Sequence, residues 1–312
     1  MTEEQINIVY NKYLDSKVKI TEIPIRAKNL TFQYIKLLLT EKGFSINETT
    51  FAENFHLLTK DGDYNKMAEL LADKNETSIK VVRFKGKEKA DGIALRNEYG
   101  EKCLVIAMKQ AFDYCIDVIN ETHTSFTKGV RKDKKLFDCD AFREVWFNAC
   151  LHNNWADGTP PAIYVYTDRI EIISTGGLPA NLSKEDFFRG VLKPVNEELA
   201  KLFIRLDLME QTGYGIPLVT RRYGKTVFEF LDFFLRVTIP FEFELENAPN
   251  DTQEKAFDDW IEEQIKKNPK ITTEELAKKS GKSVITIKRH IAKLSHIKYK
   301  GSGYSGHWEV NE

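Results

Sequence analysis

Three polar side chains recur one helical turn apart in the segment that ends at His152. Glu144, Asn148 and His152 are each separated by four residues, so a helix would place them on one face. A carboxylate and an amide one turn apart can hold a hydrated Mg²⁺ beside phosphate groups, with the glutamate orienting a water molecule. The same spacing also suits a partly buried helix whose polar groups bond to one another or to the backbone. Spacing alone favours this second interpretation.

Two glycine clusters could bring backbone amides close to a bound nucleotide. Gly176 and Gly177 follow an expected strand, whereas Gly213 and Gly215 follow an expected helix. Glycine tolerates the backbone angles and the close approach that such contacts need. Glycines also simply end helices and strands, so each cluster by itself is a weak signal.

The elements that must position these groups follow from the spacing of the apolar residues. The pattern predicts helices over residues 1–75, 104–121, 142–151 and 197–209. It predicts strands over residues 79–84, 163–166, 170–173 and 234–243. Ser183 and Asp186 form a capping box that predicts one further helix. The basic stretch 128–135 is interpreted as a solvated linker or loop.

The last sixty residues follow the order helix, helix, turn, helix and hairpin, which is typical of a winged helix-turn-helix. Thr272 and Glu275 form a capping box for the second helix, and Gly281 supplies the turn. The third helix and the wing offer side chains that can reach phosphates and base edges. These candidate DNA-binding residues are Ser283, Thr286, Lys288, Arg289, His290, Lys293, Lys298 and Lys300.

The charge of the chain is balanced overall but not locally. The 312 residues include 46 Lys and Arg against 47 Asp and Glu, a formal net charge of −1, which excludes a histone-like polycation. Between Lys266 and Lys300, eleven basic residues are opposed only by Glu274 and Glu275, so this stretch carries about nine positive charges. The charge and the helix order together favour binding to nucleic acid over the alternative of a winged helix that contacts protein.

Composition also indicates the compartment. The chain starts without the basic and apolar regions of a secretory signal, and no uncharged apolar run is long enough to cross a bilayer. The four cysteines are widely spaced, and none pairs with a histidine at a zinc-like spacing. We therefore expect a cytoplasmic protein with reduced cysteines, no structural metal and no contact with membranes.

The segment from Arg143 to Gly224 resembles the GHKL-type ATPase-like domain of proteins described as RecG-helicase-related or Schlafen/AlbA-type transcriptional regulators. The similarity is carried by the stretches REVWFNACLHNNW, DRIEIISTGGLP, FRGVLKPVNEELAKLF and LMEQTGYGI, in the order of that family. FAENFHLLTKDGDYNKMAELL and VVRFKG resemble the part that precedes this domain. The family commonly ends in a winged helix, and this chain is expected to begin just after the end of the family's AlbA-type domain.

The resemblance implies an α+β fold in which a GHKL-like sandwich places helices on one face of a mixed sheet. It implies a helical or α+β segment over residues 1–135 and an ATP-binding domain over 136–247, followed by the winged helix over 251–312. ATP and Mg²⁺ are the implied cofactors, with Glu144 as the base that orients water and Asn148 as the magnesium ligand. The residues implied to bind nucleotide are Asn148, His152, Ser174, Gly176, Gly177, Asn196, Gly213 and Gly215.

The chain departs from this family at informative positions. Ser174 stands where active enzymes have the aspartate that reads adenine, and Asn154 replaces a usual aspartate. The family's Arg-Asn-Pro stretch is Val195-Asn196-Glu197 in this chain. The phosphate-binding loop of a helicase motor, GxxxxGK[ST], has no counterpart, because Val219 and Leu276 occupy the position of its first glycine. A helicase motor on this chain is therefore excluded.

These observations together predict a DNA-binding transcriptional regulator whose central domain senses a nucleotide or a partner, and which forms homo-oligomers. Two alternatives stay open. One is a Mg²⁺-dependent ATPase that uses Glu144 and Asn148, and the other is a non-catalytic dimerisation or interaction scaffold. Ser174 and Val195 disfavour the enzyme, whereas retention of Glu144, Asn148 and both glycine clusters disfavours a fully decayed pocket.

Overall fold

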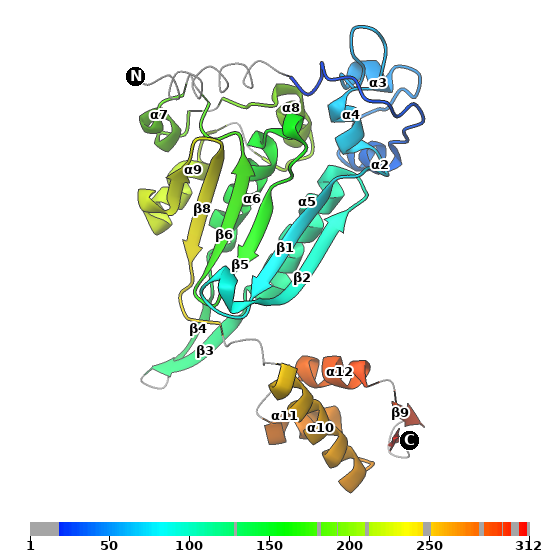
Figure 1. Cartoon of the computed structure of the whole chain (residues 1–312), viewed down its shortest axis with the longest axis vertical. Coiled ribbons are helices and arrows are strands. Elements are labelled where there is room, and N and C mark those ends of the chain that lie inside the picture. Colours follow the sequence, from blue (N-terminus) through cyan, green and yellow to red (C-terminus); the bar gives the residue numbers. More distant parts are fainter. Residues whose placement is uncertain are drawn as a thin grey trace. The chain divides into compact units, whose positions relative to one another are not determined.

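The computed structural model shows two compact units. The described residues are 19–127, 130–179, 182–191, 193–209, 212–245, 251–280, 284–294, 296–300 and 306–310. The units are Met1–Glu246 and Asn247–Glu312, and each is described by itself (Figure 1). The division between them lies close to the expected start of the winged helix at residue 251.

The first unit is built on a six-stranded mixed sheet with the strand order β2-β1-β5-β6-β8-β7. Its strands are β1 (Ser78–Phe84), β2 (Ile93–Gly100), β5 (Ala162–Val165), β6 (Arg169–Thr175), β7 (Phe228–Phe230) and β8 (Phe234–Pro240). β1 and β5 run parallel, whereas the other neighbouring pairs are antiparallel. A mixed sheet that packs against helices confirms the predicted α+β class.

This sheet contains strands from two segments that were expected to form separate domains, residues 1–135 and 136–247. β1 and β2 belong to the expected segment 1–135, yet β1 pairs with β5 from Lys80–Ala162 to Arg83–Val165. Ile79 and Val81 of β1 are buried in the same core as β5 and β6. The expected boundary between residues 135 and 136 is therefore wrong, because a split there would expose this core and leave the ladder between β1 and β5 unpaired.

Helices from both segments cover one face of the sheet (Figure 1). α5 (Leu104–Tyr114), which continues as η2 (Cys115–Ile119), contacts β1 and β2, and α6 (Cys139–His152) contacts β6. Trp146 of α6 is fully buried, and its indole nitrogen donates to the carbonyl oxygen of Met108 at 2.9 Å. The other described helices of this unit are α2 (Gln33–Glu41), α3 (Phe51–Asn54), α4 (Lys66–Leu71), η1 (Lys89–Asp91), η3 (Trp155–Asp157), α7 (Lys184–Phe188), α8 (Glu197–Arg205), α9 (Gly215–Tyr223) and η4 (Lys225–Val227).

The basic stretch that was interpreted as a loop is instead part of a β-hairpin. β3 (Thr122–Thr127) and β4 (Val130–Lys135) pair antiparallel from Thr122–Lys135 to Thr127–Val130. They form a two-stranded sheet of their own, separate from the six-stranded sheet. The loop interpretation was wrong because lysine-rich polar sequence carries little strand signal, although backbone pairing alone defines a hairpin.

The second unit has the expected order of a winged helix. Its elements are α10 (Asp251–Lys267), α11 (Thr273–Ser280), α12 (Val284–Lys293), β9 (Ile297–Lys300) and β10 (His307–Val310). A separate core includes Ile261, Leu276 and Ile287 from the three helices. The predicted capping box is present, since the amide of Thr272 donates to Glu275 Oε2 at 3.0 Å and the amide of Glu275 donates to Thr272 Oγ1 at 3.1 Å.

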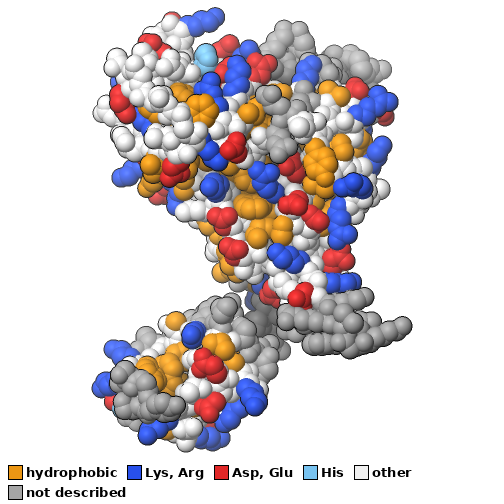
Figure 2. All heavy atoms as spheres, turned by 180° about the vertical axis from the view of Figure 1, so that it is seen from behind, with side chains coloured by type: hydrophobic (Ala, Val, Ile, Leu, Met, Phe, Trp, Pro, Cys, Tyr) orange, Lys and Arg blue, Asp and Glu red, His pale blue; other side chains and the backbone are white. Residues whose placement is uncertain are grey.

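Charged side chains of both signs cover the described surface. In the view of Figure 2, lysines and arginines alternate with aspartates and glutamates, and hydrophobic side chains lie in patches between them. This face of the first unit therefore carries mixed charge rather than a field of one sign. Among the described residues, no helix is long and apolar enough to cross a membrane.

Candidate functional site

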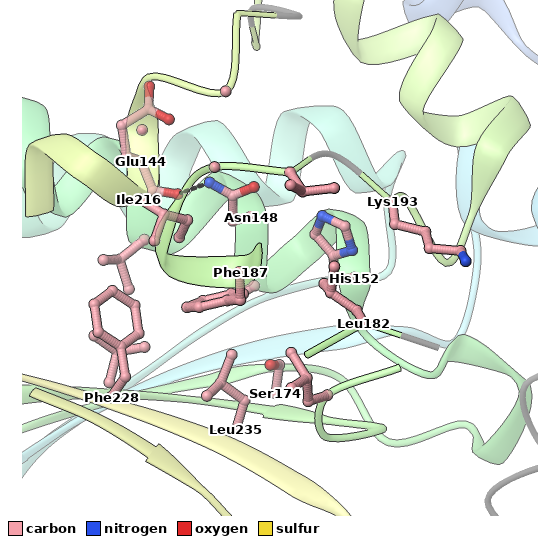
Figure 3. Close-up of a pocket in the computed structure, with 18 of the residues that line it drawn as sticks. Glu144, Asn148, His152, Ser174, Leu182, Phe187, Lys193, Ile216, Phe228 and Leu235 are labelled. Carbon is pink, nitrogen blue, oxygen red and sulfur yellow. Dashed lines mark hydrogen bonds between the residues drawn. The ribbon is translucent and has the colours of Figure 1, made fainter. Parts of the chain in front are cut away.

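Helix α6 brings Glu144, Asn148 and His152 together along one side of a cavity, as their spacing predicts (Figure 3). The helix begins at an N-cap in which Asp138 Oδ1 accepts from the amide of Ala141 at 2.9 Å. Asn148 Nδ2 donates to the carbonyl oxygen of Glu144 at 2.7 Å. This bond fixes the amide, so that Asn148 Oδ1 lies on the His152 side of the row, where it is available as a ligand.

The opposite side of the cavity is apolar. Phe187 of α7, Phe228 of β7 and Leu235 of β8 line it below the polar row, where Ser174 of β6 adds one hydroxyl, and Ile216 of α9 lies beside the row (Figure 3). The enclosed volume is about 100 Å³. A second cavity of about 790 Å³ adjoins it, and the two share the lining residues His152, Leu178, Pro179 and Lys193. A polar row above an apolar floor is the usual composition of a small-molecule site.

Glu144 lies against the first residue of α9. A Cβ added to Gly215 would be 2.1 Å from Glu144 Oε2, so a larger residue there would displace this carboxylate from its present position. The carboxylate is also 3.3 Å from the Arg143 guanidinium. Negative charge is favourable at a helix N-terminus, where backbone amides lack partners within the helix. Because the Glu144 carboxylate is itself the negative charge at this position, this end of the cavity favours a cation, and an anionic group only through that cation.

A second glycine contact closes the wall of the cavity. Gly190 follows α7 and Gly213 precedes α9, and a Cβ on either residue would lie 2.0–2.2 Å from the carbonyl oxygen of the other. Both residues have positive φ, +80° and +67°. Sequence reasoning singled out Gly213 but missed Gly190 and Lys193, which also lines the cavity. Nothing in the local spacing around Gly190 marks it, because its contact lies more than twenty residues along the chain.

His152 closes the row at the end of α6. Burial lowers the pKa of its imidazole from 6.5 to about 4, because the charged ring would lose its hydration. The ring is therefore neutral at pH 7. It can exchange hydrogen bonds with a base or a hydroxyl, but it does not add positive charge for a phosphate.

This lowered pKa predicts how acid affects stability. Between pH 6.5 and about 4 the unfolded chain protonates His152 while the folded chain does not, so stability is complete above this window and falls as the pH decreases through it. We expect His152 to account for a loss of roughly 2 kcal/mol between pH 7.5 and pH 5. Urea denaturation at both pH values should show a smaller loss for His152→Gln than for wild type. An equal loss in His152→Gln and wild type, or the same reduction in the control His123→Gln, would contradict the assignment.

Two other predicted nucleotide residues line the larger cavity rather than the first one. Asn196 is buried, and its Nδ2 donates to the carbonyl oxygens of Leu151 at 2.6 Å and Asn153 at 3.0 Å. This side chain holds the end of α6 and also lines the larger cavity, so its role as a nucleotide ligand stays a prediction. Gly176 lines only the larger cavity, where its φ of +104° turns the chain beside Asn154. Gly177 and Ser174 do line the first cavity, as the resemblance implies.

The second unit presents part of the predicted DNA-binding set. Lys288 of α12 and Lys298 of β9 are exposed, Thr286 is half-buried, and Lys300 is exposed but paired with Glu309 at 2.7 Å. Ser283 and the side chains of Arg289 and Lys293 lie outside the described part of the chain. The exposed lysines are therefore the described side chains that remain able to reach phosphates.

His290 does not belong to that set. Its ring is 2% exposed and its Nδ1 lies 2.6 Å from Asp258 Oδ1 of α10, with the Phe257 ring 5.0 Å away. The prediction that α12 exposes this histidine was wrong. His290 lies three residues after the buried Ile287 and one before the buried Ile291, and this spacing places it on the inner face of the helix.

Comparison with known proteins agrees with the expected order of domains. Residues 158–234 match the family described as "Putative ATP-dependent DNA helicase recG C-terminal", and residues 263–295 match the family described as "Winged helix-turn-helix DNA-binding". The chain thus has a RecG C-terminal-like domain followed by a winged helix, which confirms the architecture implied by the resemblance. The first match includes Ser174 and both glycine clusters, whereas Glu144, Asn148 and His152 precede it.

Full-length similarity is confined to the fold. No curated protein matches this sequence. The crystal structure of the DIP2311 protein from Corynebacterium diphtheriae is similar, with 16% identity and a TM-score of 0.57. That match covers 97% of this chain and 67% of DIP2311. The two proteins therefore share a fold. A sequence identity of 16% does not show that they share an activity.

Proposed function

We propose that this protein is a DNA-binding transcriptional regulator in which the cavity along α6 binds a nucleotide with Mg²⁺ and thereby alters DNA binding by the winged helix. The observation that carries the proposal is the convergence of Glu144, Asn148 and His152 with the N-terminus of α9 on one cavity. The nucleotide would supply the negative charge that a magnesium ion and the α9 amides can bind.

The residues present fit such a ligand. Asn148 Oδ1 offers a neutral oxygen ligand beside the Glu144 carboxylate, and Mg²⁺ usually takes only one or two protein ligands besides water and phosphate oxygens. Among the described residues, no group of three His, Cys, Asp or Glu could hold a metal ion alone. The metal would thus depend on the phosphates, and its binding would report nucleotide binding.

Space for the ligand comes from both cavities together. The volume of about 100 Å³ beside α6 is below the 300–1,000 Å³ that is common for ligand sites, but the adjoining cavity adds about 790 Å³. Because they share His152 and Lys193, one ligand can extend across both. Lys193 would then contribute the positive charge that the neutral His152 lacks.

DNA binding by the second unit is supported by its fold and by its charge. The winged-helix match spans residues 263–295 and overlaps most of the stretch 266–300 that carries about nine positive charges. Lys288 and Lys298 are exposed on the third helix and the wing. Affinity of this kind falls steeply with salt, because each neutralised phosphate releases counterions. Homo-oligomerisation would bring two winged helices to one DNA site and is part of the proposal.

Calorimetric titration with ATP and MgCl₂ tests the nucleotide half of the proposal. We expect saturable binding by the wild-type chain and roughly 10- to 100-fold weaker binding by Asn148→Ala, which lacks the oxygen ligand and its charge-assisted contact. Asn97→Ala on the edge strand β2 is the matched control and should bind as wild type does. Absence of any heat up to millimolar ATP would contradict nucleotide sensing and favour the interaction scaffold.

A further inference from the structure

The β3–β4 hairpin lies outside the cavity and outside the winged helix, and neither proposed role uses it. We propose that this hairpin is a second DNA-binding element, an arm that enters the major groove of duplex DNA. The inference rests on the proposed DNA-binding function and adds a contact from the first unit. In Figure 1 the hairpin extends away from the end of the six-stranded sheet.

The root of the arm, formed by Asn120, Leu136 and Phe137, is buried in the core of the first unit. Asn120 is buried, its Nδ2 donates to the carbonyl oxygen of Phe137, and its Oδ1 accepts from the amide of Phe137, both at 3.1 Å. Leu136 and Phe137, which follow β4, are 0–1% exposed. The amide of Leu136 donates to the carbonyl oxygen of Glu121 at 3.2 Å, which continues the pairing of the strands to the root. The direction of the arm is therefore fixed by the body of the first unit.

Beyond the root, the two strands gain little from the protein itself. They pair only with each other, and an isolated two-stranded sheet is marginally stable in water. His123 is exposed, and the centroid of its ring lies 5.3 Å from the centroid of the Phe243 ring at the base of the arm. A hairpin whose strands pair with no other strand is typical of an element that completes its contacts on a partner.

The charge of the arm identifies the partner. β4 contains Arg131, Lys132, Lys134 and Lys135 against one acidic residue, Asp133, whereas the chain as a whole has a net charge of −1. Lys134 and Lys135 are exposed, and their neighbours across the ladder, His123 and Thr122, carry no negative charge. Such an arm attracts a polyanion and would repel the same arm of a second copy.

The shape of the arm favours duplex DNA among polyanions. The major groove of B-form DNA is about 12 Å wide and admits a two-stranded β-ribbon. The major groove of an A-form RNA duplex is too narrow and deep for side chains to read. Lys134 and Lys135 are adjacent in the strand and point to opposite faces, so a ribbon lying in the groove would direct one lysine towards each wall.

Salt-dependent DNA binding by the full chain tests the arm. The variant Lys134→Gln/Lys135→Gln is compared with wild type by fluorescence anisotropy on a 30-base-pair duplex over a range of salt concentrations. If each lysine neutralises one phosphate, the slope of log affinity against log salt should be about 1.8 less steep for the variant than for wild type. Extrapolated from 1 M salt, this difference makes the variant bind roughly 60-fold more weakly at 0.1 M salt. Lys74→Gln/Lys109→Gln removes the same charge from exposed sites on the first unit and should leave the slope unchanged.

The outcomes separate the arm from the winged helix. If wild type binds duplex DNA and the arm variant keeps the wild-type slope, the arm proposal is overturned while the DNA-binding function stands. If wild type binds no duplex, both are overturned. An unchanged slope with a smaller oligomer in sedimentation would make the arm a self-association surface and would also overturn the proposal. Equal losses of affinity on a DNA duplex and an RNA duplex would contradict entry into the major groove.

Discussion

Replacing Gly190 by alanine is expected to lower the free energy of unfolding of the first unit by roughly 2–5 kcal/mol. The added Cβ would be 2.0 Å from the carbonyl oxygen of Gly213, and a backbone atom cannot swing aside as the end of a flexible side chain does. The φ of +80° adds strain, because this region disfavours every residue with a Cβ. Urea denaturation measures the loss, and nucleotide binding should fall with it because this contact forms the cavity wall.

Gly43→Ala is the matched control for this prediction. Its φ is +85°, nearly that of Gly190, but no heavy atom lies within 4 Å of the added Cβ. Alanine at this position should therefore show the backbone strain alone, about 1–2 kcal/mol. Equal decreases in the free energy of unfolding for Gly190→Ala and Gly43→Ala would show that the close packing of Gly190 on Gly213 does not stabilise the cavity wall.

Local patterns predicted α6, which carries the polar row of the candidate site. The four-residue spacing of Glu144, Asn148 and His152 placed them on one helix face, and α6 does direct them to one cavity. The capping box at Thr272 and the N-cap at Ser183 could be found from sequence, because each joins residues only three apart; at α7 the amide of Asp186 donates to Ser183 Oγ at 3.0 Å. The strands expected over residues 163–166 and 170–173 correspond to β5 and β6, whose apolar residues share the core.

Features that depend on distant parts of the chain escaped prediction. The contact between Gly190 and Gly213 exists only because α7 and α9 fold against one another. β2 was missed because an edge strand has one free side and carries exposed Ile93 and Leu95 among polar residues. α9 was missed because Gly215 and Pro217 disfavour a helix interior, although both are tolerated in a first turn.

The role of a polar residue was harder to predict than its position. Asn196 was expected to bind nucleotide, and in the structure its side chain also donates two bonds to main-chain oxygens at the end of α6, which the sequence did not indicate. His290 was expected to contact DNA, yet it is buried against Asp258. In both residues a buried polar group pairs within the protein, and only the three-dimensional structure shows which partner it finds.

Coupling between the cavity and the winged helix is the second large effect that we expect. A nucleotide that favours one arrangement of the protein should change its affinity for duplex DNA by about 5- to 150-fold. By the same linkage, DNA should change the affinity for ATP by an equal factor. Asn148→Ala should retain basal DNA binding, because its side chain lies in the first unit, but should respond to ATP only at much higher concentrations.

The most direct test is the anisotropy of a labelled 30-base-pair duplex titrated with the full chain, with and without saturating ATP and MgCl₂. We expect at least a fivefold change in DNA affinity for wild type, and for Asn148→Ala the same change only at roughly 10- to 100-fold higher ATP. Identical binding curves for wild type with and without saturating nucleotide would contradict the claim that the cavity along α6 controls DNA binding.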